Sequence, residues 1–142
     1  MKKLLLIVFI LTTTATIAQD NWGDMKKNKL TMKELPPVWP GCTGTVSEKD
    51  TCFNQKLTKH IGTNFKYPEE EYKKNIEGRV VVKFKINAKG IVEIRSITGG
   101  NKGLQEAAKE NILKIPQLKP GMMGGQPRAI NMTIPFNFKT NK

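Results

Sequence analysis

Residues 78–90, with the sequence GRVVVKFKINAKG, decide the fold, because apolar and polar residues alternate along them. Every second residue from Val80 to Ile86 is apolar, and lysine occupies two of the three positions between them. Successive side chains of a strand point to opposite faces of a sheet. The pattern therefore predicts a strand that packs one face against a core and leaves the other face mostly wet.

A short turn at residues 87–90 predicts that the next strand runs antiparallel beside the first. In this second strand Val92 and Ile94 alternate, but the next apolar residue is Ile97. One residue too many separates Ile94 from Ile97. The skipped step predicts a bulge near Arg95-Ser96.

A helix and a third strand complete the expected sheet. Leu104, Ala108 and Ile112 recur at helical spacing, and Pro116 ends the helix. A second alternation, from Ile130 to Phe138, predicts the third strand. A helix that joins the second and third strands crosses the sheet most simply when the first strand is central. We predict an α+β fold with a three-stranded antiparallel sheet in the order 2-1-3, packed by a crossover helix.

Pro135 supports placing the third strand at an edge, because proline has no N–H to give to a neighbouring strand. An open edge can dock an extended peptide, whose main chain completes the ladder of hydrogen bonds. It can also be covered by residues 36–46 or by a second copy of the chain in a homodimer. All of these satisfy the same edge, and the sequence leaves the choice open.

The first 35 residues predict an export signal and a flexible linker. Lys2 and Lys3 precede an apolar run at 4–11 and small residues at 16–18, which is typical of a signal peptide over residues 1–18. The run is shorter than the roughly 20 residues that span a bilayer. The alternative is a retained inner-membrane anchor at 4–18. Residues 19–35 are polar, lysine-containing and poor in apolar groups, as in a flexible linker.

Residues 36–66 predict an added loop and helix that carry the cysteine pair. Ser47 and Asp50 are spaced like a capping box, and Gly62 predicts the helix end. The residues that repeat every four positions and form an apolar stripe are Phe53, Leu57 and Ile61. His60 lies beside this stripe, and without a nucleophile or carboxylate at a recognisable spacing we interpret it as a partly buried helical histidine.

Cys42 and Cys52 are the only cysteines of the chain. An exported chain meets an oxidising compartment, and an even count of two fits one disulfide. The alternatives are two free thiols, or a metal site for which His60 would supply only a third ligand. Their spacing also differs from the Cys-x-x-Cys of redox-active pairs. We predict a Cys42–Cys52 disulfide.

The formal charge of +12 allows two interpretations. Removal of Lys2 and Lys3 with a signal peptide lowers it by two, to +10. The charge either solvates a small exported protein or forms a face that binds polyanions. Nucleic-acid binding would require exposed aromatic residues among the basic ones, and the phenylalanines of the strands lie on apolar faces. We also expect no enzyme, no cofactor and no metal, because no acid–base pair, nucleophile–histidine pair or ligand set has a usable spacing.

The order of several short motifs carries a family resemblance over residues 67–139. The motifs are Tyr67-Pro68, Ile76-Glu77-Gly78, the strand with Val80, Val82 and Phe84, Leu104 with Ala107-Ala108, Lys119-Pro120-Gly121, and Pro135-Phe136-Asn137-Phe138. In this order and spacing they resemble the C-terminal domain of TonB-type energy transducers. The chain departs from the usual family pattern at Lys66, Glu71 and Leu118.

The resemblance implies a periplasmic, non-catalytic domain that grips a short box near the N-terminus of outer-membrane transporters. Carried over to this chain, the partner-binding residues are Asn64, Lys66, Tyr67, Arg128, Ala129, Ile130, Asn131, Met132 and Thr133. Residues 19–35 as a flexible spacer would average only about 20–25 Å end to end, too short to cross the periplasm. We therefore expect an exported module that binds an envelope protein, with a membrane-anchored transducer as the alternative.

Overall fold

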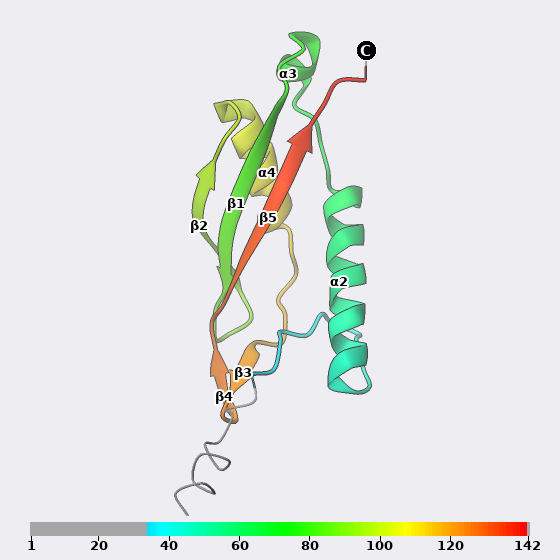
Figure 1. Ribbon diagram of the computed structural model, residues 1–142, viewed down its shortest axis with the longest axis vertical. Helices are drawn as coiled ribbons and strands as arrows, with labels where there is room; N and C mark the ends of the chain where they lie inside the picture. Colours follow the sequence, from blue (N-terminus) through cyan, green and yellow to red (C-terminus); the bar gives the residue numbers. More distant parts are fainter. Residues whose placement is uncertain (1–33, 142) are drawn as a thin grey trace, which may run out of the picture. The chain divides into compact units, whose positions relative to one another are not determined.

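The computed structural model describes residues 34–141, so the predicted signal peptide and residues 19–33 of the predicted linker lie outside the described residues. The elements, in chain order (Figure 1), are α2 (Val46–Thr63), α3 (Glu69–Lys73), β1 (Gly78–Ile86), β2 (Val92–Thr98), α4 (Lys102–Leu113), β3 (Gly121–Met123), β4 (Gln126–Arg128) and β5 (Ile130–Phe138). The main sheet has the order β2-β1-β5, with both pairs antiparallel. This confirms the predicted fold class and strand order.

The central strand β1 has the predicted alternation. Val80, Val82, Phe84 and Ile86 are all buried, while Arg79 and Lys83 are exposed. On one side β1 pairs with β5 without interruption, from Gly78 opposite Phe138 to Ile86 opposite Ile130.

The pairing of β1 with β2 slips once. Lys83 lies opposite Ser96 and Phe84 opposite Ile94, which leaves Arg95 as the extra residue. The predicted bulge is confirmed.

Helices α4 and α2 contribute to the core on the packed side of the sheet. Leu104, Ala108 and Ile112 of α4 are fully buried, and Phe53 and Leu57 of α2 join the same core. Two hydrogen bonds also join the helices. His60 of α2 donates from Nε2 to the backbone carbonyl of Asn111 on α4 (3.0 Å). Asn111 in turn donates from its side-chain Nδ2 to the backbone carbonyl of Ile61 on α2 (3.0 Å). His60 is thus the partly buried structural histidine that the sequence predicted.

Both predicted ends of α2 are wrong by two residues. The N-cap is Thr45, whose hydroxyl accepts from the N–H of Glu48 (3.3 Å), while the Glu48 carboxylate accepts from the N–H of Thr45 (2.7 Å). A capping box needs a side chain that reaches back to the cap, and Asp50 is one methylene shorter than Glu48. At the other end Gly62 lies inside the last turn, and Asn64 is the C-cap.

A hairpin of β3 and β4, which the sequence analysis did not predict, precedes β5. Its two-residue loop is Gly124-Gly125, and both residues have the positive φ that a type I′ turn requires (60° and 79°). Leu35 pairs with Met122 of β3 through bonds of 2.7 and 2.9 Å, and Val38 pairs with Lys119. Leu35, at the end of the predicted linker, is therefore part of the ordered structure.

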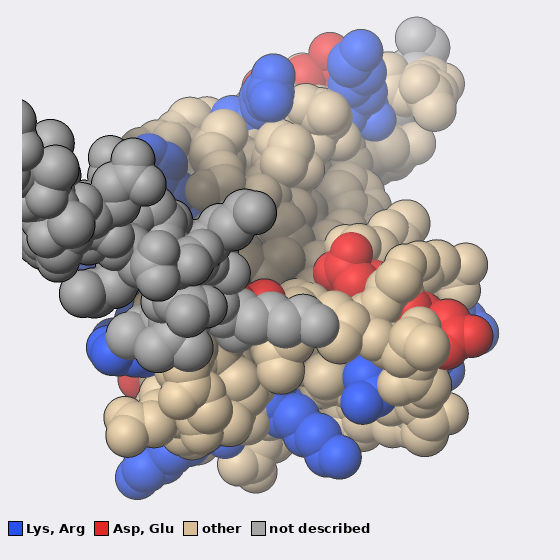
Figure 2. Space-filling model, turned by 60° about the horizontal axis from the view of Figure 1, so that its bottom comes forward, with Lys and Arg blue, Asp and Glu red and all other residues tan. Residues whose placement is uncertain are grey.

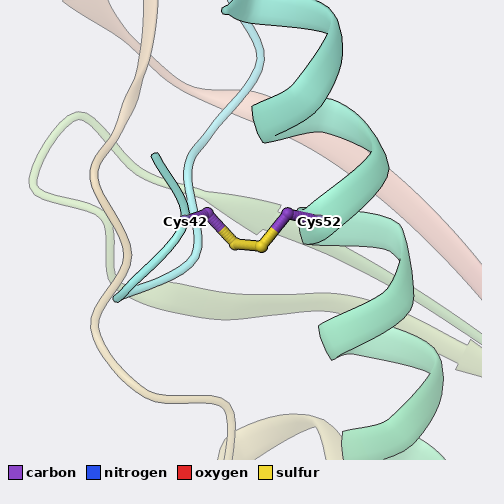
Figure 3. Close-up of a disulfide and its surroundings, with 2 residues drawn as sticks. All are labelled: Cys42 and Cys52. Atoms are coloured by element: carbon purple, nitrogen blue, oxygen red, sulfur yellow. A yellow bond between two sulfur atoms is a disulfide. The ribbon is translucent and has the colours of Figure 1, made fainter. Parts of the chain in front are cut away.

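The predicted disulfide is present. Figure 3 shows Cys42, in the loop before α2, bonded to Cys52 within the helix. Beside it Trp39 packs edge-on against Phe53, with ring centroids 6.0 Å apart. The bridge and the aromatic contact together hold the entry loop against α2.

Replacing both cysteines, as Cys42→Ala with Cys52→Ala, should lower the free energy of unfolding by about 2.5–3 kcal/mol, because the unfolded chain regains the freedom of the closed loop. For a domain of this size the melting temperature should fall by about 10 °C, measured by circular dichroism. Reduction of the wild-type chain should produce the same fall. An unchanged melting temperature in both experiments would show that the bridge is not a structural support.

Candidate functional site

The outer edge of β5 is open, since within residues 34–141 this strand pairs with β1 alone. Its backbone directions follow from β1. Asn87, the residue after β1, donates its N–H to the carbonyl of Ile91 on the β2 side (2.9 Å). Backbone groups alternate in direction along a strand. Odd-numbered residues of β1 therefore turn toward β2, and even-numbered residues turn toward β5.

The register transfers this alternation to β5. The residues opposite the even-numbered positions of β1, which bond to it, are Ile130, Met132, Ile134 and Phe136. The residues whose backbone groups point outward are Asn131, Thr133, Pro135 and Asn137. Pro135 agrees with this assignment, because a strand tolerates proline where its nitrogen faces away from the ladder. The edge thus offers three outward N–H donors, at Asn131, Thr133 and Asn137.

The side chains along this edge differ between the two faces. On the packed face Ile130, Met132 and Ile134 are only half-buried, whereas Phe136 and Phe138 are buried. Asn131, Thr133 and Asn137 are exposed on the other face. The first half of β5 consequently presents an incompletely covered apolar strip beside free backbone donors, which an added strand could cover.

The opposite edge of the sheet, β2, is a poorer template for an added strand. It has seven residues against nine in β5, and the extra residue Arg95 interrupts its register. Bulges bend an edge and disrupt its ladder, which is one way proteins block edge pairing. The uninterrupted ladder therefore singles out β5.

The first group of predicted partner-binding residues lies at the C-terminal end of β5. The Tyr67 ring packs edge-on against Phe138 (centroids 5.4 Å apart), and its hydroxyl donates to the carbonyl of Ile76 (2.6 Å). Burial, followed by the Glu77 and Glu71 carboxylates, raises the pKa of Tyr67, which keeps the hydroxyl a donor.

The neighbours of Tyr67 differ in how far they are engaged within the chain. Asn64 donates to the carbonyl of His60 (2.9 Å), whereas Lys66 is exposed. Phe65, which lies between Asn64 and Lys66, is 40% exposed, and the centre of its ring lies 5.0 Å from that of Phe138.

The second predicted group lies at the opposite end of β5. Arg128 belongs to β4, opposite Gly121, and Ala129 links β4 to β5. The strand begins with the remaining predicted residues, Ile130, Asn131, Met132 and Thr133. Thr133 and Phe138 are about 17 Å apart along the strand. The structure places the two groups toward opposite ends of β5 and does not join them in a cluster, and their role in binding stays a prediction.

A hydrogen-bonded clamp fixes the chain as it leaves β5. Glu77, just before β1, accepts from both the hydroxyl (2.7 Å) and the N–H (2.6 Å) of Thr140. These bonds, with a smaller contribution from Lys139, hold the pKa of Glu77 below its ordinary value of 4.5. The far end of the candidate edge is thereby tied to the start of the central strand.

The clamp predicts a pH dependence. A carboxylate with a depressed folded-state pKa stabilises the fold above its ordinary pKa, and this stabilisation is lost as the pH falls below 4.5 toward the folded value. The melting temperature of Glu77→Gln should therefore lie below that of the wild type at pH 7, and this difference in melting temperature should be smaller at pH 3. At pH 7 Thr140→Val, which keeps the backbone donor, should differ from the wild type by less than Glu77→Gln does. A difference between Glu77→Gln and the wild type that is the same at both pH values would exclude the clamp.

Comparison with known proteins identifies the family. The family model described as Gram-negative bacterial TonB protein C-terminal matches residues 63–140, more than half of the chain. The chain belongs to this family. Its domains are non-enzymatic protein-interaction domains of the cell envelope, associated with energy transduction and with binding of outer-membrane transporters.

Similar solved structures include two NMR solution structures of the Helicobacter pylori TonB C-terminal domain. The longer one (residues 179–285 of that protein) is 23% identical to this chain. The match covers 72% of this chain and 88% of that structure, with a TM-score of 0.45. The shorter one (residues 194–285) is 22% identical, and the match covers 63% of this chain and 96% of that structure, with a TM-score of 0.38. No curated protein matches the chain.

Two kinds of feature are absent from the described part of the chain. None of the helices within residues 34–141 is long and apolar enough to cross a membrane. The same residues contain no group of three or more His, Cys, Asp or Glu side chains that could hold a metal ion.

Proposed function

We propose that the outer edge of β5 docks an extended peptide from an outer-membrane transporter or another envelope protein by strand addition, in the periplasm. The observation that carries the proposal is the nine-residue strand with an uninterrupted inner ladder and three outward donors. Main-chain hydrogen bonds would supply affinity, and the side chains of alternate residues would supply specificity.

The geometry fixes how such a peptide would lie. From Asn131 to Asn137 the outward groups extend over about 20 Å, so a peptide of about seven residues would reach all three donors. Every second side chain of the peptide would cover the half-buried Ile130, Met132 and Ile134. The residues between would lie beside Asn131 and Thr133. An apolar–polar alternation in the partner is therefore expected.

Within residues 34–141 β5 pairs with β1 alone, so residues 36–46 do not cover its outer edge by strand pairing. Residues 35–38 pair elsewhere, Leu35 with Met122 and Val38 with Lys119. Of the occupants considered for the edge, a partner peptide and a second copy of the chain remain to be distinguished. Photo-crosslinking in cells from Asn131, with Ser96 on β2 as the matched control position, distinguishes them. Capture of an envelope protein supports the proposal, capture of a second copy supports a homodimer, and equal capture from both positions contradicts a specific role of β5.

Proline substitutions test the edge with the captured partner. Thr133→Pro removes an outward donor, so it should keep the fold and weaken partner binding by about tenfold or more. Met132→Pro is the matched control, because its N–H bonds to β1. It should lower the free energy of unfolding by about 1–3 kcal/mol by leaving a buried acceptor unpaired. Binding is measured by titration and folding by thermal melting. Thr133→Pro that folds and binds like the wild type would show that β5 is not the docking edge.

Export is tested separately. If residues 1–18 are a cleaved signal peptide, mass spectrometry of the chain from envelope fractions should find a mature form that begins near Gln19. A chain that retains Met1 in the inner membrane would instead identify residues 4–18 as an anchor.

We also propose that residues 36–66 are an addition that precedes the family domain. A chain truncated at residue 63 tests this boundary.

A further inference from the structure

The face of the main sheet that α2 and α4 leave uncovered carries a concentration of basic side chains. Arg79 and Lys83 of β1 are exposed on it, Lys85 is half-exposed, and Arg95 is exposed at the bulge of β2. We call these four residues the basic sheet face. Lys83 lies between Ser96 and Thr133 on the neighbouring strands, so its immediate neighbours there are uncharged.

Glu93 is the one acidic residue in the three strands, and it is paired with a basic residue of the same face. Its carboxylate lies 2.8 Å from the ammonium of Lys85 and also accepts from Asn87 (2.7 Å). The hydrogen bond from Lys85, followed by that from Asn87, lowers the pKa of Glu93, with a further contribution from the charge of Arg95. Within the described residues, Arg79 and Lys83 have no carboxylate of their own.

Charge elsewhere on the molecule is distributed differently. Figure 2 shows Lys and Arg side chains scattered over one face, with acidic side chains among them. On α3, Lys73 pairs with Glu69 and Lys74 with Glu70, and on α4 Lys109 approaches Glu106 (3.6 Å). The net charge alone therefore marks no binding surface. The sheet face differs because its basic residues outnumber the single acidic one.

The other side chains of this face suit phosphate groups. They are mostly small hydrogen-bonding groups, and the exposed ones are Ser96, Thr98, Asn131, Thr133 and Asn137. Val81 and Pro135 are the apolar members, paired with each other across the strands. The phenylalanines of the strands are buried on the other face. A specific protein interface normally needs aromatic or large apolar anchors at its centre, and single-stranded nucleic acid needs aromatic stacking partners.

We propose that the basic sheet face docks on the surface of a bilayer rich in anionic phospholipid. A ladder of three strands is broad and without deep side-chain anchors, which matches a planar array of phosphates better than a protein pocket. Basic residues near an anionic membrane surface are attracted by its negative potential over about a Debye length. The outward backbone groups of β5 lie in the plane of the sheet, so the edge stays accessible while the face rests on lipid.

The test compares two double variants of the full chain that remove the same charge. Arg79→Gln with Lys83→Gln alters the basic sheet face, and Lys56→Gln with Lys59→Gln alters exposed positions of α2. Each chain is sedimented with vesicles of phosphatidylcholine alone and of phosphatidylcholine with phosphatidylglycerol, at low ionic strength. For each chain, the partition coefficient on vesicles with phosphatidylglycerol is divided by that on phosphatidylcholine alone. This ratio isolates the electrostatic contribution to membrane binding, because every chain carries the same apolar N-terminal run.

The attraction of each basic side chain near the surface corresponds to about a fivefold change in partition. The sheet-face variant should therefore lower the ratio by about 25-fold, the α2 variant should lower it much less, and both should melt like the wild type. Equal losses in the two variants, or a wild-type ratio near one, would overturn the proposal. Thr133→Pro should leave the ratio unchanged, so a failure of lipid docking and a failure of peptide docking are distinguishable.

Discussion

The antiparallel pairing of β1 with β5 is the constraint on which the rest of the structure depends. It joins residues about fifty positions apart over nine consecutive pairs. Because β1 is central, the buried row from Val80 to Ile86 forms one core with the buried residues of α4 and α2. The same pairing leaves β5 with one satisfied side and one open side. The candidate site is therefore a direct consequence of strand order.

Helix α2 limits which surfaces remain available. Its disulfide to Cys42 and its hydrogen bonds with Asn111 fix it on the packed side of the sheet, and Trp39 fills the space beside Phe53 and His60. Most of the apolar face of the sheet is thus covered within the chain. What remains are the half-buried strip of Ile130, Met132 and Ile134, the backbone edge beside it, and a polar, basic face.

Sequence patterns predicted the long elements with a regular period and missed the two short strands. The nine-residue alternations of β1 and β5, and the skipped step at Arg95, depend on burial of one face, which leaves a period of two in the sequence. The three-residue strands β3 and β4 are too short to show a period, and their contact with Leu35 joins segments far apart in the chain. Gly124-Gly125 was the one local signal of that hairpin. Pro135 placed β5 at an edge, but the directions of Asn131 and Thr133 required the register and the bond of Asn87.

The edge and the face of the same sheet use different physical interactions, and this allows one small domain to serve two contacts. Strand addition uses main-chain groups, whose number is set by strand length and which respond weakly to salt. Docking on phosphate groups uses side-chain charges and is screened within about 10 Å at moderate ionic strength. Along β5 the two meet at Asn131 and Thr133, whose backbone groups point outward along the edge while their side chains lie on the face. Small polar side chains at these positions are compatible with both contacts. A large apolar residue would favour burial of the face, and a carboxylate would pair with Lys83 or Lys85 on the neighbouring strand and so cancel the positive charge that attracts phosphate groups.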